Sequence, residues 1–190
     1  MKMRSLYDGV GDRKYTSFAE RLAFFEAAST LTNPAHRLFC MVLLNTGCRI
    51  SEALALKRSH VDRGGRSLVF LTLKQRREIH YRPVPVPDAL IESLLALPVT
   101  DDSYLFNFGR TTGWKIIKAC MRSAGIEGIK ATPKGLRHGY AIGCVSIGLI
   151  QSKIQELLGH KRSETTSIYT THITDDIRQQ FDKIWITKGI

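Results

Sequence analysis

Apolar residues at helical spacing run through most of this 190-residue sequence, and this periodicity limits the possible folds more than any other feature. Phe18, Leu22 and Phe25, for example, recur at intervals of four and three residues, which predicts a helix with one buried face. Ser17 before this run and Glu20 three residues later form the signature of a capping box. The same reasoning predicts helices over about 17–30, 34–47, 50–56, 88–97, 111–124, 133–147 and 150–159, a short helix over 165–170 and a last helix over 174–186.

One stretch in the middle of the chain departs from helical spacing. Residues 68–71 are a β-type apolar run, and after a basic stretch a second extended segment covers 81–86. The prolines in and beside this second segment suit an edge strand, because proline has no N–H to donate to a central ladder. We therefore predict a mainly α (α+β) fold, a helical domain with a small antiparallel sheet. The length suits one domain, placed at 17–190 after a flexible arm at 1–16.

The charge balance is the least ordinary part of the composition. Lysine and arginine number 28 against 17 aspartates and glutamates, so the net charge is +11. Such an excess favours a polyanionic partner, usually nucleic acid, with an anionic membrane surface or plain solubilising charge as alternatives. The longest apolar run, seven residues at 38–44, is too short to span a membrane. Cys40, Cys48, Cys120 and Cys144 include no CxxC pair, which predicts buried thiols in a soluble, cytoplasmic protein.

Several common catalytic motifs are missing from the sequence. There is no GxxxxGK phosphate loop, no GxGxxG turn and no HExxH zinc motif. The acidic pairs at 101–102 and 175–176 lie in turn-like or helix-starting contexts, and nothing else completes a two-metal carboxylate cluster. We therefore expect no metal and no cofactor. Positive charge for chemistry on phosphates must then come from side chains.

The first segment that offers such side chains is 46–54. Gly47 ends one predicted helix, and Arg49 begins the next, where backbone N–H groups already favour an anion. Glu52 lies one helical turn further on and is placed to hold the Arg49 guanidinium in position. The alternative is an ordinary surface arginine–glutamate pair.

Two later segments add further candidates. Lys134, Arg137 and His138 stand on one face near a helix start, either as a cationic cluster aimed one way or as a solvated basic face. His160 ends an apolar helix, and Tyr169 follows nine residues later. Taken alone, Tyr169 is more simply a half-buried packing residue.

Together the three segments resemble the tyrosine recombinase (phage integrase) family. The sequence has Gly-Cys-Arg-Ile-Ser-Glu at 47–52, Leu-Arg-His at 136–138, and Leu-Gly-His at 158–160 with Tyr169 nine residues on. Arg82 ahead of Pro-Val-Pro in the second extended segment is a further match. The resemblance covers nearly the whole chain in the family's order and spacing.

The resemblance implies a site-specific DNA recombinase that cleaves and rejoins double-stranded DNA through a covalent 3′-phosphotyrosyl intermediate and self-associates on DNA as a tetramer. The positions that match the family's catalytic residues are Arg49, Lys74, Arg137, His160 and the nucleophile Tyr169, with Lys134 where the family usually has histidine, and with Glu52 and His138 in support. Two alternatives stay open. One is a non-catalytic DNA-binding accessory or regulatory protein that retains the fold, and the other is a type IB topoisomerase-like relaxase.

The two ends of the chain raise separate questions. Typical family members carry a DNA-clamping domain before the catalytic one, whereas about 16 residues precede the first predicted helix here, as in short invertase-type members. DNA is then clamped differently, or a partner supplies the clamp, or this is one piece of a longer chain.

At the other end, Ile177, Phe181, Ile184 and Trp185 form an apolar stripe. The stripe docks on its own domain or, as is common in the family, on a neighbouring protomer; we favour the second and expect truncation before Ile177 to spare the domain but prevent assembly.

Overall fold

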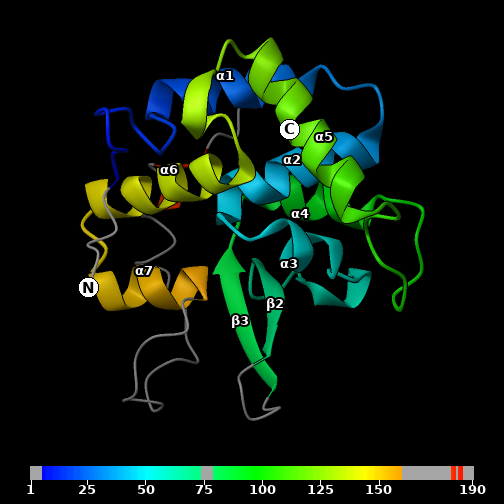
Figure 1. The fold of residues 1–190 in the computed structure, drawn as a ribbon. Helices are drawn as coiled ribbons and strands as arrows, with labels where there is room; N and C mark the ends of the chain where they lie inside the picture. Colours follow the sequence, from blue (N-terminus) through cyan, green and yellow to red (C-terminus); the bar gives the residue numbers. More distant parts are fainter. Residues whose placement is uncertain (1–5, 74–78, 160–180, 183, 186–190) are drawn as a thin grey trace.

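The computed structural model describes residues 6–73, 79–159, 181–182 and 184–185. Within these ranges a helical body carries a small sheet at one side, with α7 beside β3 (Figure 1). The elements in chain order are α1 Phe18–Ser29, α2 Pro34–Thr46, α3 Ile50–Leu54, the 3-10 turn η1 Arg58–His60, β1 Val61–Asp62, β2 Ser67–Leu73, β3 Ile79–Pro85, α4 Asp88–Leu95, α5 Arg110–Ser123, the 3-10 turn η2 Gly128–Lys130, α6 Pro133–Ser146 and α7 Gln151–Leu158. The predicted mainly α (α+β) class is confirmed.

Local sequence signals set several helix ends as expected. The Ser17 side chain accepts a hydrogen bond from the Glu20 backbone N–H, and Glu20 returns one to the Ser17 N–H, so the capping box is formed. Pro34 opens α2, where its fixed φ suits the first turn. Gly47 ends α2 in the left-handed region at φ 60°.

The buried face of α1 differs from the predicted one. Phe18 is 57% exposed and Leu22 is 38% exposed, although both belong to the expected apolar stripe. The residues of α1 that are buried are Arg21, Phe24, Phe25 and Ala28. Helical spacing does not separate the two choices, because adjacent Phe24 and Phe25 allow either face to be apolar, and the packing of α1 against α2, α5 and α6 decides between them.

Arg21 is buried because the tertiary structure provides acceptors for its guanidinium. Its Nη2 donates to the carbonyls of Leu44 at 3.1 Å and Ile184 at 3.4 Å. Gly143 of α6 leaves room for it, since a Cβ there would lie 3.1 Å from Arg21 Nη1. Burial lowers the pKa of Arg21. Arginine at this position is therefore a core residue, which its polarity alone would not predict.

The sheet is antiparallel with strand order β1-β2-β3. β3 lies at an edge, as its prolines predict, and pairs with β2 in a register that places Arg82 opposite Phe70. The two-residue β1 was not predicted. It is too short to give a periodic signal in the sequence.

Helix α2 forms the centre of the core. All its residues from Leu38 to Thr46 are buried, and it contacts α1, α4, α5 and α6 (Figure 1). The four cysteines are free and buried, as predicted, and the Cys40 and Cys120 sulfur atoms lie 3.7 Å apart. In the described part of the chain, no helix is both long and apolar enough to cross a membrane.

The described residues near the two ends differ in how far they contact the domain. At the N-terminal end, Tyr7 and Arg13 form an antiparallel bridge within a largely exposed segment, whereas Thr16 is buried and its N–H donates to the Gly135 carbonyl at 3.2 Å. At the C-terminal end, a buried group docks on its own chain, where the Phe181 ring lies 6.2 Å from that of Tyr140.

Phe181, Ile184 and Trp185 are all buried in this single chain. These described residues of the apolar stripe therefore dock in cis, the alternative to the neighbouring-protomer docking that we favoured. A truncation that removes them would open the core beside Tyr140. The expected helix over 165–170 and most of that over 174–186, Ile177 included, lie outside the described residues.

Candidate active site

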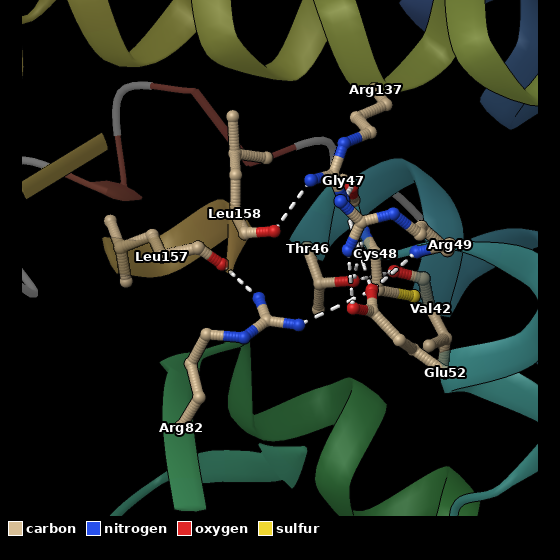
Figure 2. A network of polar contacts seen from close by, with 10 residues as sticks. All are labelled: Val42, Thr46, Gly47, Cys48, Arg49, Glu52, Arg82, Arg137, Leu157 and Leu158. Carbon is tan, nitrogen blue, oxygen red and sulfur yellow. Dashed lines mark hydrogen bonds and ion pairs between the residues drawn. The ribbon is translucent and has the colours of Figure 1, made fainter. Parts of the chain in front are cut away.

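Three arginine guanidiniums converge on a single carboxylate (Figure 2). Glu52 of α3 lies 2.8 Å from Arg49 through Oε1, and its Oε2 lies 3.3 Å from Arg82 and 3.7 Å from Arg137. The arginines come from the start of α3, from β3 and from α6, so only the tertiary fold brings them together. One carboxylate cannot neutralise three cations, and the cluster keeps a net positive charge suited to an anion.

Arg49 is the open member of this cluster. It is the N-cap residue of α3, and its backbone N–H donates to Glu52 Oε2 at 2.7 Å while its Nη1 donates to Oε1 at 2.8 Å. Its side chain is 46% exposed, whereas that of Glu52 is only 10% exposed. The expected Arg49–Glu52 contact is present. It is not an ordinary surface pair, because its carboxylate is buried among further cations.

Arg137 is held by two backbone carbonyls from different segments. It is 8% exposed, its Nη1 donates to the Gly47 carbonyl at 2.8 Å, and its Nη2 donates to that of Leu158 (Figure 2). Burial and the neighbouring Arg49 lower the pKa of Arg137 to about 10, so it is still a cation at neutral pH. Gly47 permits the close packing of α6 on the end of α2, since a Cβ there would lie 2.7 Å from the Tyr140 ring.

Arg82 is the member that we did not place in the site from the sequence. It is 6% exposed, and its guanidinium carbon lies 4.9 Å from the centre of the Phe70 ring. Its Nη1 donates to the Leu157 carbonyl at the end of α7. The sequence did contain an indication of this. Arg82 and Val84 are two residues apart in an extended segment, so they share a face of the strand, and the structure buries both.

Lys134 and His138 lie on α6 with Arg137. Lys134 is exposed in the first turn and His138 is half-buried. Burial, then the nearby Lys134 and Arg137, lower the pKa of His138, so its neutral form dominates at neutral pH. The three side chains therefore do not form one cluster aimed the same way: Arg137 turns inward to Glu52, whereas Lys134 is exposed and His138 is half-buried.

Lys74, His160 and Tyr169 lie outside the described residues. The structure does place the segments that precede two of them in sequence. Strand β2 ends at Leu73, directly before Lys74, and α7 ends at Gly159, directly before His160, in the left-handed region at φ 64°. Across the described ranges, no group of three or more His, Cys, Asp or Glu is arranged to hold a metal ion.

Guanidiniums fixed around one carboxylate, with Arg49 open to solvent, can donate several hydrogen bonds to a phosphate group. Comparison with known proteins identifies the family. The profile of the phage integrase family matches residues 15–175. Tyrosine recombinase XerA of Thermococcus onnurineus is 33% identical over 171 residues, covering 84% of this chain and 58% of that protein. Tyrosine recombinase XerC of Bradyrhizobium diazoefficiens is 36% identical over 140 residues, covering 68% of this chain and 43% of that protein.

Solved structures give the same result for the fold. The crystal structure of XerA recombinase superposes with a TM-score of 0.66 at 28% identity, over 89% of this chain and 64% of that one. XerH site-specific recombinase bound to difH substrate superposes with a TM-score of 0.66 at 21% identity, over 95% of this chain and 60% of that one. This chain belongs to the phage integrase family. It spans somewhat more than half the length of the XerA relatives that it matches.

Proposed function

We propose that this chain is the catalytic domain of a site-specific DNA recombinase, which cleaves and rejoins double-stranded DNA through a 3′-phosphotyrosyl intermediate. The observation that carries the proposal is the arrangement of Arg49 and Arg137 around Glu52. Both guanidiniums are oriented before any DNA arrives. The family membership and the DNA-bound state named for the XerH structure support the same substrate.

The proposed reaction exchanges one phosphate ester for another. The Tyr169 hydroxyl gives its proton to water as its oxygen attacks the DNA phosphorus, the P–O(tyrosyl) bond forms, and the bond from phosphorus to the 5′-oxygen breaks. Arg49 and Arg137 grip the non-bridging oxygens as negative charge builds on them, a bidentate contact that lysine cannot make. The reverse reaction with another 5′-hydroxyl rejoins the strand, so the ester bond energy is conserved.

Proton transfer is assigned to the remaining candidates. The leaving 5′-oxygen takes a proton, for which Lys74 is the proposed general acid. His160, Lys134 and His138 add donors near the phosphate. Lys134 replaces the family's usual histidine, and its exposure suits a point-charge contact with a phosphate oxygen.

The proposed partners follow from the family resemblance. Double-stranded DNA is the substrate, four chains act together on it, and an accessory protein or a separate DNA-clamping protein is a further partner. The proposed location is the cytoplasm, in association with the nucleoid where the substrate lies. The net charge of +11 supports a polyanionic partner.

Covalent capture from a randomised duplex library tests the proposal. Each duplex carries a nick just downstream of the random region, so the cleaved fragment with its 5′-hydroxyl diffuses away and the adduct is trapped. We expect SDS-stable adducts in excess EDTA, enriched in one sequence, with the phosphate on Tyr169 in peptide mapping. DNA binding without any adduct would favour the non-catalytic alternative, and adducts without sequence preference would favour a relaxase.

The affinity for DNA should fall steeply with salt. If the bound protein neutralises about five DNA phosphates, the slope of the logarithm of the association constant K against log[salt] is about −4 to −5, because each contact releases counterions. Fluorescence anisotropy with a labelled duplex between low and physiological salt measures the slope. A slope near zero would mean that the charge excess only solubilises the protein.

Lys134 should tolerate histidine but not alanine. Lys134→His keeps a donor to the phosphate and should retain measurable cleavage, whereas Lys134→Ala should lose about 10-fold, the scale of one lost charged donor. Single-turnover cleavage of the captured sequence measures both. Lys115→Ala, which removes an exposed lysine of α5, is the matched control. Full activity of Lys134→Ala would return Lys134 to a solvated basic face.

A further inference from the structure

Arg82 is too enclosed to grip a DNA phosphate as Arg49 can. Only 6% of it is exposed, and the Phe70 ring, its partner across the β2–β3 ladder, covers one side of the guanidinium. Such stacking on an aromatic ring suits arginine more than lysine. The buried cation therefore acts on other protein groups.

Two of those groups belong to segments far apart in the sequence. Nη2 of Arg82 lies 3.3 Å from Glu52 Oε2 on α3, and Nη1 donates to the Leu157 carbonyl at the end of α7 (Figure 2). The planar fork of one side chain thus joins the first turn of α3 to the last turn of α7. Lysine, a single point charge, cannot hold both groups in fixed directions.

The contact with Glu52 determines how Arg49 is held. Glu52 uses Oε1 for the Arg49 side chain, while Oε2 accepts from the Arg49 N–H and faces Arg82 and Arg137. Arg82 is nearer to Oε2 than Arg137 is, at 3.3 Å against 3.7 Å. Without Arg82, the carboxylate loses its closer buried counter-charge and with it one fixed orientation.

The contact with α7 caps the C-terminal end of that helix. The carbonyls of Leu157 and Leu158, which lack partners within the helix, are taken up by Arg82 and Arg137. Gly159 follows at φ 64°, and a Cβ there would lie 3.1 Å from Arg82 Nε. Arg82 thus lies against the turn from which the chain continues to His160.

We propose that Arg82 is a positioning residue for the reaction. Its guanidinium holds Glu52 and the end of α7 in one arrangement, and so orients Arg49 without touching DNA. The catalytic consequence rests on the proposed function. The structural consequence, that Arg82 couples α3 to α7, does not.

Arg82→Lys tests the catalytic consequence, with Arg63→Lys as the matched control. Arg63 is an exposed arginine that pairs with Glu92. With the captured DNA sequence, single-turnover cleavage by Arg82→Lys should fall roughly 10- to 100-fold, the range for a lost charge-assisted hydrogen bond, while the Kd for DNA stays within about three-fold. Cleavage within two-fold of wild type, or an equal loss of binding and cleavage, would overturn the proposal.

Glycine variants provide a second test if Arg82→Lys does not fold. Gly159→Ala places a methyl group against Arg82. Gly148 also has a positive φ, 84°, but a methyl group added there would have no atom within 4 Å, so Gly148→Ala is the control. We expect Gly159→Ala to slow cleavage at unchanged Kd, and Gly148→Ala to stay close to wild type. Equal rates for the two alanine variants would contradict the role assigned to Arg82.

Amide hydrogen exchange separates a failure of this inference from a failure of the proposed function. Peptides covering 49–54 and 151–159 should both exchange faster in Arg82→Lys than in wild type and Arg63→Lys, whether or not any DNA is cleaved. If wild type forms no adduct but these peptides respond together, the recombinase proposal fails and the coupling stands. Unchanged exchange in either peptide overturns the coupling itself.

Discussion

Replacing Tyr169 with phenylalanine should abolish covalent attachment to DNA while leaving the Kd within a few-fold. The substitution removes one oxygen, the proposed nucleophile, and keeps the ring. Nicked duplexes carrying the captured sequence, followed by SDS gels, measure the adduct. Anisotropy with the same duplex measures binding.

The structure narrows the choice of other tyrosines. Tyr140 is fully buried, and burial raises its pKa well above the ordinary value, so it cannot meet a DNA phosphate as a nucleophile. Tyr104 is 56% exposed, and its described contacts are with Lys57 rather than with Glu52 or its arginines. Tyr104→Phe is therefore the control and should keep full adduct formation. An SDS-stable adduct from Tyr169→Phe would refute the assignment.

Arg137→Lys should lose about 10²- to 10³-fold in the single-turnover cleavage rate, the cost of removing one preorganised donor to the transition state. Lysine keeps the charge but not the fork, and it cannot hold the Gly47 and Leu158 carbonyls together. Since the pKa of Arg137 is about 10, Arg137 stays protonated between pH 7 and 9. The cleavage rate of the wild type should therefore not fall in this range through loss of the Arg137 charge.

Arg122→Lys on the exposed side of α5 provides the comparison for this variant. Thermal unfolding of both variants shows whether the buried site tolerates lysine. A folded Arg137→Lys protein that cleaves at more than one tenth of the wild-type rate would argue against a bidentate clamp. It would leave Arg137 as a structural cation.

The helix ends were predictable because their causes are local. Ser17 with Glu20, Pro34, Gly47 and Gly159 each act through the backbone of the residues beside them, and each lies where the sequence places it. The same holds for Arg49 and Glu52, which face each other across one helical turn. Lys74, His160 and Tyr169 remain predictions from the family resemblance.

The buried faces were less predictable, because an apolar stripe does not say which neighbour covers it. Phe18 and Leu22 fit a core pattern yet are exposed, while Arg21 of α1 is enclosed by α2, α6 and Ile184. The C-terminal stripe is a similar case, since its apolar residues fit docking in cis or on a neighbour equally well. The single chain buries Phe181, Ile184 and Trp185 in cis.

The sequence by itself determined the class of fold, the approximate bounds of the described helices and the motifs that mark the family, because these depend on periodicity, local capping and motif order. Only the tertiary structure decided that Arg49, Arg82 and Arg137 share Glu52. These arginines come from the start of α3, from β3 and from α6. The sequence alone does not show whether an arginine side chain faces water or a buried carboxylate. Its role depends on which acceptors the fold brings within reach, and for Arg82 those are Glu52 and the end of α7.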